Sequence, residues 1–476
     1  MVDQIVSHAR TANSTAPRLD SIPVAQFVRN GFLTVKTSLP SAFHAEMRQR
    51  AGIVLDREGN WGNNILPRLP DLQQVLDDPA VRGALSTLLG PTYALHPHRY
   101  CHRNEPGSTA QRLHKDTREF SGDRHLRHHR PRWLIAFYYP QDVHTDMGPT
   151  AIVPRAQYYL EQPDDRLWPE ELLCPPEGTV ALVHFGMWHR ATANISVGPR
   201  YMFKFEFARM DEPDAFEASE PATDPAMDED DAPVRHPAVW AHLERWIRGA
   251  RTRAPETHVG VKEMPALVDS LGDVDEPVRL DAAYALARAS TPAVAAVARL
   301  LRESNGLTRR YAAYALTAMG GPAVETLMDL AVDQDENVRI NAIDALGDMG
   351  SPATPAVETL GQALHAPSPW VRRHAAEALG TLGSGAAPAI PALAMALKDQ
   401  QPYVRVNAAT AIARIGPAAS EAVPALDETL RDTDRYARGW AALALRRIGT
   451  PEAMSALVDR LMVARWCSTT TTEDRY

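Results

Sequence analysis

Two His-x-Asp triplets are the residues of this chain whose types and spacing could most directly do chemistry. They are His114-Lys115-Asp116 and His144-Thr145-Asp146. Because side chains two apart on a strand point to the same side, the imidazole and the carboxylate of one triplet can reach a single metal ion. About one such triplet is expected by chance at this content of His and Asp, so the motif alone is weak.

A histidine and an arginine further along the chain give the motif a context. The segment 178–191 contains an apolar, strand-like run that ends before His189, and Arg200 opens another apolar run. A non-haem Fe(II) oxygenase holds its iron with two imidazoles and one carboxylate on one face of an octahedron, which leaves three positions open. The second imidazole must come from a distant strand. An arginine can then pair bidentately with the far carboxylate of 2-oxoglutarate.

Several motifs between about residues 20 and 210 resemble the phytanoyl-CoA dioxygenase family of double-stranded β-helix oxygenases. The segment 26–33 is similar to the family's opening helix and strand. The segment 146–154 looks like its mid-domain turn and strand. The resemblance closes with the following residues: Trp188, His189, Arg190, Asn194, Ser196 and Arg200.

This resemblance implies a jelly-roll oxygenase that uses Fe(II), 2-oxoglutarate and dioxygen. Carried over position by position, it assigns the metal ligands to His114, Asp116 and His189, and the 2-oxoglutarate anchor to Arg200. Related halogenases have a small residue in place of the carboxylate, which makes room for halide. The presence of Asp116 therefore indicates hydroxylation, or another oxidation, of an unactivated C–H bond.

The resemblance also implies two softer contacts with the cosubstrate. Thr150 falls where the family often places a residue beside 2-oxoglutarate, and Ser196 lies in the segment that leads to Arg200. The sequence departs from the family nearby, because Met147 stands where Asn is usual and 155–157 reads Arg-Ala-Gln where Gly-Ser-His is usual. These departures concern substrate contacts and not the metal site.

The second triplet competes with the first for the role of ligand pair. His144 and Asp146 precede Gly148-Pro149, which favours a loop over a ligand strand. The context therefore favours His114 and Asp116. An interpretation of the histidines as buried core residues does not account for the whole set.

The first 210 residues must supply the elements that position these side chains. Short runs of aromatic and β-branched residues, bounded by Pro, Gly and Asp, predict the strands of an all-β sandwich or barrel. The expected strands and the two helices before them are 133–139, 150–154, 179–185, 201–207, 22–29 and 42–51. We therefore expect a double-stranded β-helix domain over residues 1–210.

A change of composition separates this domain from the rest of the chain. The stretch 211–233 carries acidic charge interleaved with Pro, Ala and Ser, which predicts a solvated linker. An amphipathic helix is expected within the connecting segment 234–257. Its apolar stripe must pack on the barrel or cap the part that follows.

The segment 258–463 repeats itself. A second-helix signature begins at residues 278, 308, 338, 371, 404 and 437, at intervals of 30, 30, 33, 33 and 33 residues. Such a period predicts stacked helix pairs with one continuous core, here an all-α HEAT-like solenoid followed by a flexible tail at 464–476. The repeats resemble short HEAT repeats of the phycobilisome-lyase-like type. A bilin-lyase function would leave the first 210 residues unexplained.

One arginine recurs at the same place in each repeat. A structural role is expected for it, because a repeated Arg can bond the carboxylates or carbonyls of a neighbouring repeat. The recurring residues are Arg279, Arg309, Arg339, Arg372, Arg405 and Arg438.

Charge, cysteine content and hydropathy exclude several classes of protein. A formal net charge of -9 argues against nonspecific binding of nucleic acid, which needs clustered Lys and Arg. Three cysteines without a CxxC pair make a disulfide framework improbable, and Cys101 and Cys174 are expected to be buried thiols. The sequence shows no signal peptide and no apolar run long enough for a membrane span. We expect a cytoplasmic protein with no nucleic-acid or membrane partner.

A basic stretch surrounds the first triplet and has two interpretations. It can form a mouth that attracts an acidic substrate, or a solvated loop that the acidic linker partly neutralises. Its residues are His102, Arg103, Arg112, Lys115, Arg118, Arg124, Arg127, His128, His129, Arg130 and Arg132.

Two functions from different classes follow from the sequence. The first is an Fe(II)- and 2-oxoglutarate-dependent dioxygenase that acts on a small-molecule, peptide or carrier-protein-bound substrate. Its solenoid would bind a substrate protein or partner, or self-associate. The second is a HEAT-repeat scaffold with a non-catalytic barrel. The complete ligand set favours the first.

Overall fold

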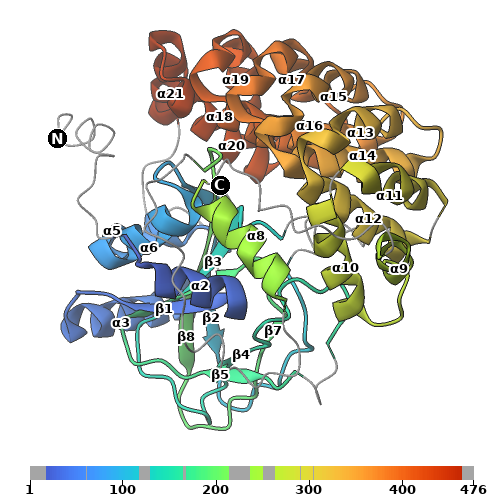
Figure 1. Cartoon of the computed structure of the whole chain (residues 1–476). Helices are drawn as coiled ribbons and strands as arrows, with labels where there is room; N and C mark the ends of the chain where they lie inside the picture. Colours follow the sequence, from blue (N-terminus) through green and yellow to red (C-terminus); the bar gives the residue numbers. More distant parts are fainter. Residues whose placement is uncertain are drawn as a thin grey trace. The chain divides into compact units, whose positions relative to one another are not determined.

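The computed structural model describes residues 18–59, 62–116, 129–163, 168–213, 236–249, 263–289, 291–303 and 305–463. The described part of the chain divides into two compact units (Figure 1). The first runs up to Arg209 and the second begins at Met210. Residues 214–233 of the acidic stretch and residues 464–476 of the tail lie outside the described residues.

Two antiparallel sheets form the frame of the first unit. The larger sheet has the strand order β1-β6-β3-β8-β2, and the smaller has the order β5-β4-β7. The strands of the larger sheet are β1 Phe32–Lys36, β2 Ala94–Asn104, β3 Trp133–Tyr139, β6 Thr179–His184 and β8 Arg200–Ala208. Those of the smaller sheet are β4 Thr150–Ile152, β5 Glu171–Leu173 and β7 His189–Ala191.

Successive side chains along each strand of the larger sheet point to opposite faces, so the sheet has two different faces. On β3, Leu134, Ala136 and Tyr138 join a core cluster with the N-terminal helices. The residues between them face the other way, and Ile135 and Phe137 share a second cluster with residues of β4 and β5. The helices on the outer face are α2 Ser21–Asn30, α3 Ser41–Glu58, α4 Ile65–Arg68, α5 Gln73–Asp77 and α6 Pro79–Leu89.

The first unit is therefore a double-stranded β-helix, as expected, with its interior between the two sheets. Strand β8 lies next to the edge of the larger sheet and pairs with β3 on one side and with the edge strand β2 on the other. Lys204 of β8 lies opposite Phe137 of β3 and Tyr100 of β2. Since Phe137 faces the interior, so does every second residue of β8, beginning with Arg200. Strand β8 thus delivers polar side chains into the barrel.

The second unit is an α-solenoid. The second helices of successive repeats follow one another, and other helices, most of them shorter, lie between them (Figure 1). The second helices are α10 Glu276–Ala289, α12 Gly306–Met319, α14 Glu336–Met349, α16 Pro369–Thr381, α18 Pro402–Ile415 and α20 Arg435–Ile448. The others are α8 Pro237–Ile247, α9 Met264–Ser270, α11 Thr291–Glu303, α13 Val324–Leu330, α15 Val357–Ala363, α17 Ile390–Ala396, α19 Val423–Thr429 and α21 Pro451–Val463.

Small residues let the second helices of neighbouring repeats approach closely. A Cβ atom added at Gly347 of α14 would lie 2.7 Å from the Cα of Ala378 in α16. A Cβ added at Gly380 of α16 would lie 2.9 Å from the Cα of Ala411 in α18. Both distances are too short for a real contact, so these helices pack with backbone against backbone at these points.

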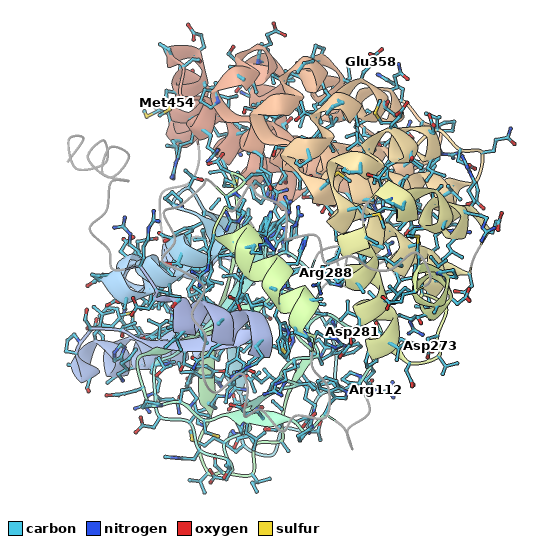
Figure 2. All side chains as sticks on the ribbon, viewed as in Figure 1. Arg112, Asp273, Asp281, Arg288, Glu358 and Met454 are labelled. Carbon is cyan, nitrogen blue, oxygen red and sulfur yellow. The ribbon has the colours of Figure 1, made fainter. Side chains whose placement is uncertain are left out.

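The connecting helix α8 packs on the solenoid within the second unit. It contacts α10. His236, which precedes α8, lies 2.7 Å from a carboxylate oxygen of Asp281 on α10, and Asp281 is labelled in Figure 2. Of the two positions expected for this helix, the structure shows the contact with the solenoid.

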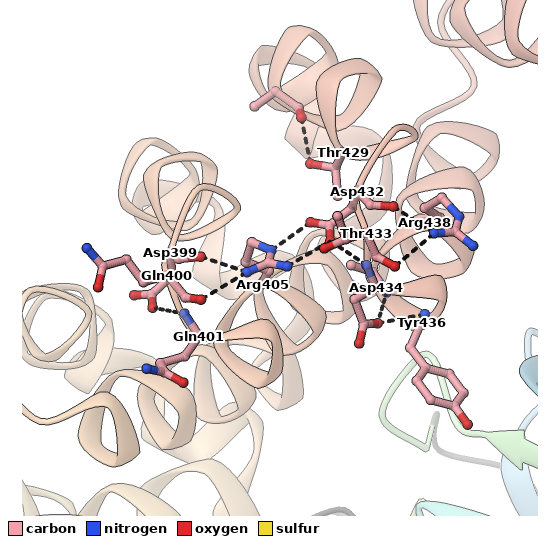
Figure 3. A network of polar contacts seen from close by, with 12 residues as sticks. Asp399, Gln400, Gln401, Arg405, Thr429, Asp432, Thr433, Asp434, Tyr436 and Arg438 are labelled. Atoms are coloured by element: carbon pink, nitrogen blue, oxygen red, sulfur yellow. Dashed lines mark hydrogen bonds and ion pairs between the residues drawn. The ribbon is translucent and has the colours of Figure 1, made fainter.

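The recurring arginine bonds backbone carbonyls that precede its own helix, and in two repeats it also bonds a carboxylate of the next repeat (Figure 3). The Nη1 group of Arg405 donates to the carbonyls of Asp399 and Gln400, at 2.9 and 3.3 Å. Its Nε and Nη2 groups donate to the carboxylate of Asp432, one repeat further on, at 2.6 and 2.8 Å. Arg372 forms the same pattern with Asp399. The expected bond to a neighbouring repeat is therefore observed for Arg372 and Arg405, whereas Arg279, Arg339 and Arg438 bond carbonyls of their own loops.

Within the described residues, no helix combines the length and the hydropathy that crossing a membrane requires.

Candidate metal centre

A backbone bridge brings the first triplet to the second histidine. His114 and His189 form an antiparallel bridge in which each backbone N–H donates to the other residue's carbonyl, at 3.0 and 2.9 Å. His189 begins β7, so His114 adds to the free edge of the smaller sheet. Asp116 lies in the turn that follows the bridge. His114 and His189, which are 75 positions apart in the sequence, therefore meet at one edge of the smaller sheet.

The three side chains converge. The Nε2 atom of His114 lies 3.9 Å from Oδ1 of Asp116, and the Nε2 atom of His189 lies 3.7 Å from Oδ2. One ligand atom from each residue lies within 4.8 Å of the others, so a single ion can be shared. Within the described residues, no other three His, Cys, Asp or Glu side chains meet this condition.

Backbone carbonyls fix the orientation of both imidazoles. The Nδ1 atom of His114 lies 2.9 Å from the carbonyl oxygen of Arg112, and that of His189 lies 3.0 Å from the carbonyl oxygen of Met187. An Nδ1–H that donates to a carbonyl leaves the lone pair on Nε2, which is the arrangement found in metal-ligating histidines. Both lone pairs then lie on the side of Asp116.

Burial and a neighbouring cation determine the charge of Asp116. Burial alone would raise the pKa of this carboxyl, but the Lys204 ammonium, 2.7 Å away, and the two imidazoles hold it well below its usual range. Burial lowers the pKa of His189, and the Asp116 carboxylate opposes this shift. The site therefore presents an ionised carboxylate and a neutral imidazole at neutral pH, which are the protonation states that bind metal.

Arg200 is buried near the end of β8 with part of its guanidinium unpaired. It is 1 % exposed, and its Nε and Nη2 groups donate to the carbonyl of Gly148 at 3.1 and 2.8 Å. Its Nη1 group is buried and has no hydrogen-bond partner. Burial lowers the pKa of the guanidinium, and the Tyr139 hydroxyl is the first group that opposes this shift. An unpaired buried guanidinium group calls for an anionic ligand.

The acceptor for Arg200 sits in a turn that only glycine can form. Gly148 has φ +69°, and a Cβ atom there would lie 2.2 Å from Nδ2 of Asn104 and 2.8 Å from the carbonyl oxygen of Thr192. The same Asn104 amide donates to both the Gly148 and Thr192 carbonyls, at 3.1 and 3.3 Å. The Gly-Pro turn noted in the sequence thus positions the arginine.

The two softer candidates differ in their surroundings. Thr150 of β4 is buried, and its hydroxyl accepts a hydrogen bond from Tyr139 at 3.2 Å. Ser196 uses its hydroxyl within the turn before β8, where it donates to Asn194 and to the Gly198 carbonyl at 2.7 and 3.0 Å. Thr150 therefore lies beside Tyr139, which neighbours Arg200, whereas the bonds of Ser196 stabilise the turn.

The competing triplet does not form a site. His144 and Asp146 are both exposed, in the turn between β3 and β4. The carbonyl of Asp146 accepts backbone hydrogen bonds from Ile195 and Ser196 at 2.8 and 3.0 Å. This is the loop that the sequence context favours.

The basic stretch is mostly paired where the structure describes it. Lys115 is buried and donates to the carbonyls of Gln157 and Tyr159 at 3.2 and 2.6 Å. Arg103 pairs with Asp56 and Glu105. Arg112, labelled in Figure 2, is exposed. The residues Arg118, Arg124, Arg127 and His128 lie outside the described residues.

The two described cysteines differ in exposure. Cys101 is buried, and burial raises the pKa of its thiol to about 12. Cys174 is exposed, so the expectation of a buried thiol is wrong there. It lies just after β5 at the end of a short edge strand, which leaves it open to solvent.

Two residues of the site were not singled out from the sequence. Tyr139 and Lys204 lie in the middle or at the end of strands that read as ordinary core segments. A lysine flanked by Phe203 and Phe205 was the available signal, because a charge within an apolar strand has to be paired when it is buried.

A comparison with protein-family models matches the C-terminal region of the chain. A family model for HEAT repeats matches residues 264–335, 294–357, 324–401 and 390–465. The C-terminal region is therefore a HEAT-repeat solenoid. A comparison with curated protein sequences found no match.

Among solved structures, the chain is similar to non-haem 2-oxoglutarate oxygenases. The α-ketoglutarate-dependent carbocyclase SnoK from nogalamycin biosynthesis is 19% identical, over 42% of this chain and 87% of that one, with a TM-score of 0.35. HygX from Streptomyces hygroscopicus, with nickel and 2-oxoglutarate bound, is 17% identical over 40% and 88%, with a TM-score of 0.33. EctD from S. alaskensis, with 2-oxoglutarate and 5-hydroxyectoine, is 15% identical over 41% and 78%, with a TM-score of 0.36. At these values, the chemistry has to be argued from the side chains of this chain.

Proposed function

We propose that this protein is an Fe(II)- and 2-oxoglutarate-dependent dioxygenase that hydroxylates, or otherwise oxidises, an unactivated C–H bond. The observation that carries the proposal is the convergence of His114, Asp116 and His189 in one unit with a buried, partly unpaired Arg200. The substrate is a small molecule, a peptide or a group bound to a carrier protein.

The ligand set suits iron. Two imidazole nitrogens and one carboxylate oxygen form the donor set of non-haem Fe(II) oxygenases, and two imidazoles with their Nε2 atoms on the side of Asp116 fit it. The Nε2 atoms of His114 and His189 and one oxygen of Asp116 would hold the ion. Bound iron, together with 2-oxoglutarate and dioxygen, supplies an oxidant strong enough to attack an unactivated C–H bond.

Arg200, Tyr139 and Thr150 are suited to the cosubstrate. The free Nη1 group of Arg200 can form a charge-assisted hydrogen bond with the distal carboxylate of 2-oxoglutarate. The Tyr139 hydroxyl donates to Thr150, so a donor from Thr150 remains for the same carboxylate. Ser196 would contribute by stabilising the turn that leads to Arg200.

The overall reaction balances for a hydroxylation. The substrate C–H, 2-oxoglutarate and dioxygen give the C–OH product, succinate and carbon dioxide. One oxygen atom enters the product and the other enters succinate. Asp116 occupies the position that halogenases leave small, which favours hydroxylation over halogenation.

Apolar side chains line the interior beside His189. Phe137 lies with its ring centroid 6.0 Å from that of His189, and Ile135, Phe137 and Met202 are buried in the cluster between the two sheets. A dry interior strengthens the electrostatic interactions of the site and protects a reactive oxidant from side reactions. Two sides of the site are thus apolar, while β8 and β2 provide the polar side.

We assign the solenoid a binding role that serves this chemistry. HEAT-like arrays present extended surfaces built from repeated helices, and such surfaces suit protein partners. The solenoid would hold a substrate protein, a carrier or a second copy of the chain. We propose the domain order given by the sequence: oxygenase at 1–210, linker at 211–233, connecting helix at 234–257, solenoid at 258–463 and tail at 464–476.

An anaerobic titration tests the proposed function. Fe(II) and 2-oxoglutarate added to the protein should produce a visible metal-to-ligand charge-transfer band, because the ketoacid chelates the iron. The variant His189→Ala should abolish the band, whereas His144→Ala, which removes an exposed imidazole of the other triplet, should retain it. A wild-type protein that binds iron but shows no band with 2-oxoglutarate would favour the scaffold with a non-catalytic barrel.

A further inference from the structure

Lys204 brings an ammonium group into the barrel beside the metal ligands. It lies on β8, where its side chain is 9% exposed, and its Nζ atom donates to Oδ2 of Asp116 at 2.7 Å. The carboxylate is 12% exposed. An ion pair this short and this buried fixes the orientation of both side chains, because neither can exchange its partner for water.

A second carboxylate holds the lysine in place. Oε1 of Glu206, two residues further along the same face of β8, lies 3.3 Å from Nζ of Lys204. Glu206 is 1 % exposed and lies 3.8 Å from Nε2 of His98 on β2. The chain of contacts therefore runs from β2 across β8 to the turn that carries Asp116. Lys204 is therefore held from both sides, by Glu206 within the sheet and by Asp116 in the turn.

The Nζ atom of Lys204 lies between two carboxylates, 2.7 Å from Asp116 and 3.3 Å from Glu206. One cation between two carboxylates also explains how the larger sheet tolerates a lysine between Phe203 and Phe205.

The way in which Asp116 offers its oxygens matters for the proposed reaction. A facial set of two imidazoles and one carboxylate oxygen leaves three positions, two for the ketoacid and one for dioxygen. A carboxylate that binds with both oxygens takes up one of these three. An amine that holds one oxygen in a hydrogen bond makes this second contact unfavourable.

We propose that Lys204 is a positioning residue that holds one oxygen of Asp116, so that the carboxylate offers a single oxygen to the metal and the third open position is preserved. This inference rests on the proposed function, since it concerns the same ion. It adds a role for Lys204, with Glu206 as the group that positions the lysine.

Water-proton relaxation of the Mn(II)-loaded full-length protein tests the inference without turnover. Mn(II) in the site should carry about three exchangeable waters in wild type, one for each open position. In Lys204→Met the carboxylate is free to bind with both oxygens, so the relaxation per bound ion should fall by about one third. Lys36→Met, which removes an exposed lysine of β1, should match wild type.

The outcomes separate the inference from the function. Wild type with about two waters overturns the inference even if the variant does not fold, and so does a Lys204→Met protein that relaxes water like wild type. A Lys204→Met protein that folds but binds no Mn(II) also overturns it, because Lys204 would then be needed for the site as a whole. Failure of wild type to bind Mn(II) at a one-to-one ratio would instead count against the metal centre itself.

Discussion

At the scale of single residues, the site consists of ordinary groups whose surroundings leave one function open to each. The two imidazoles have Nδ1 engaged by backbone carbonyls, so that Nε2 is available. Arg200 has two of its guanidinium nitrogens engaged by Gly148 and a third without a partner. Each unsatisfied atom points to a ligand of opposite character, a cation for the imidazoles and an anion for the guanidinium.

Substitution of Arg200 should weaken 2-oxoglutarate binding selectively. Truncating one partner of a buried, hydrogen-bonded charge pair costs about 2–5 kcal/mol, and about 1.4 kcal/mol corresponds to tenfold in affinity. Arg200→Ala should therefore raise the dissociation constant of 2-oxoglutarate by about 30-fold or more, measured by calorimetry on the anaerobic metal-loaded protein. The control Arg190→Ala removes a residue of β7 that pairs with Glu170, and it should leave the dissociation constant of 2-oxoglutarate within a factor of about two. Equal affinities for wild type and Arg200→Ala would show that the anchor lies elsewhere.

The buried His184 should make the protein less stable in mild acid. Burial, with a smaller effect of Lys115, lowers the pKa of His184 to about 3, while an unfolded chain has a His pKa of about 6.5. Between these values the unfolded state binds the extra proton, so stability falls as the pH drops from about 6.5 towards 3. The melting temperature should decrease over this range by calorimetry. In His184→Asn the decrease should be smaller, and in His144→Asn, which alters an exposed residue, it should be unchanged. An identical pH dependence for His184→Asn and wild type would contradict this account.

At the scale of elements, the sequence predicted the helices and strands whose pattern of apolar residues reflects burial on one or both of their faces. The strand expected over 133–139 is β3 as observed, and the repeated second helices fall where the signature places them. The long strand β2 was missed. One face of this strand packs on the apolar core through Cys101, but the residues on the other face include His98, Tyr100 and His102 because that face lies on the side of Lys204. The polar composition that hid the strand is a consequence of its position.

For the candidate site, the sequence predicted the types of the metal-ligating residues and the motifs in which they lie. The partners of Tyr139 and Lys204 come from other strands, and neither the register of β8 against β3 nor the contact with Asp116 can be read from one segment. The distinction between Thr150 and Ser196 depended on which hydroxyl was already used within its own turn. Pairing across strands, and not local pattern, decides these roles.

Helix packing in the solenoid should be sensitive to a single methyl group at Gly347. A Cβ there would meet the backbone of Ala378 at 2.7 Å, so α14 and α16 would have to move apart. Gly347→Ala should destabilise the solenoid by about 1–3 kcal/mol, measured by chemical denaturation followed by circular dichroism. Gly361→Ala in α15 is the matched control. Its nearest contact would be 3.9 Å away, and its better helix propensity should raise stability by about 1 kcal/mol or less. Equal effects of the two substitutions would contradict the close packing.

At the scale of the whole molecule, the residues of interest fall into two compact units. The three proposed metal ligands and Arg200 lie in the first unit, and the recurring arginines lie in the second. The proposed chemistry and the stacking of the repeats therefore involve different residues. A change in one set should leave the other intact, as is usual for sites without shared partners.

Metal binding should stabilise only one of these units. A ligand that binds the native state at 100 times its dissociation constant adds about 2.7 kcal/mol. In scanning calorimetry of the full chain, Co(II) should raise the melting temperature of the barrel transition and leave that of the solenoid transition unchanged. His114→Ala should abolish the shift. A shift that persists in His114→Ala would place the cobalt outside the proposed site.

The most direct test of the metal centre is a crystal structure of the anaerobic protein with Fe(II) and 2-oxoglutarate. It should show one iron within about 2.0–2.2 Å of Nε2 of His114, Nε2 of His189 and one oxygen of Asp116, with the distal carboxylate of 2-oxoglutarate on Arg200. Iron bound elsewhere, or side chains of these three residues that do not reach a shared ion when iron is present in excess, would contradict the account.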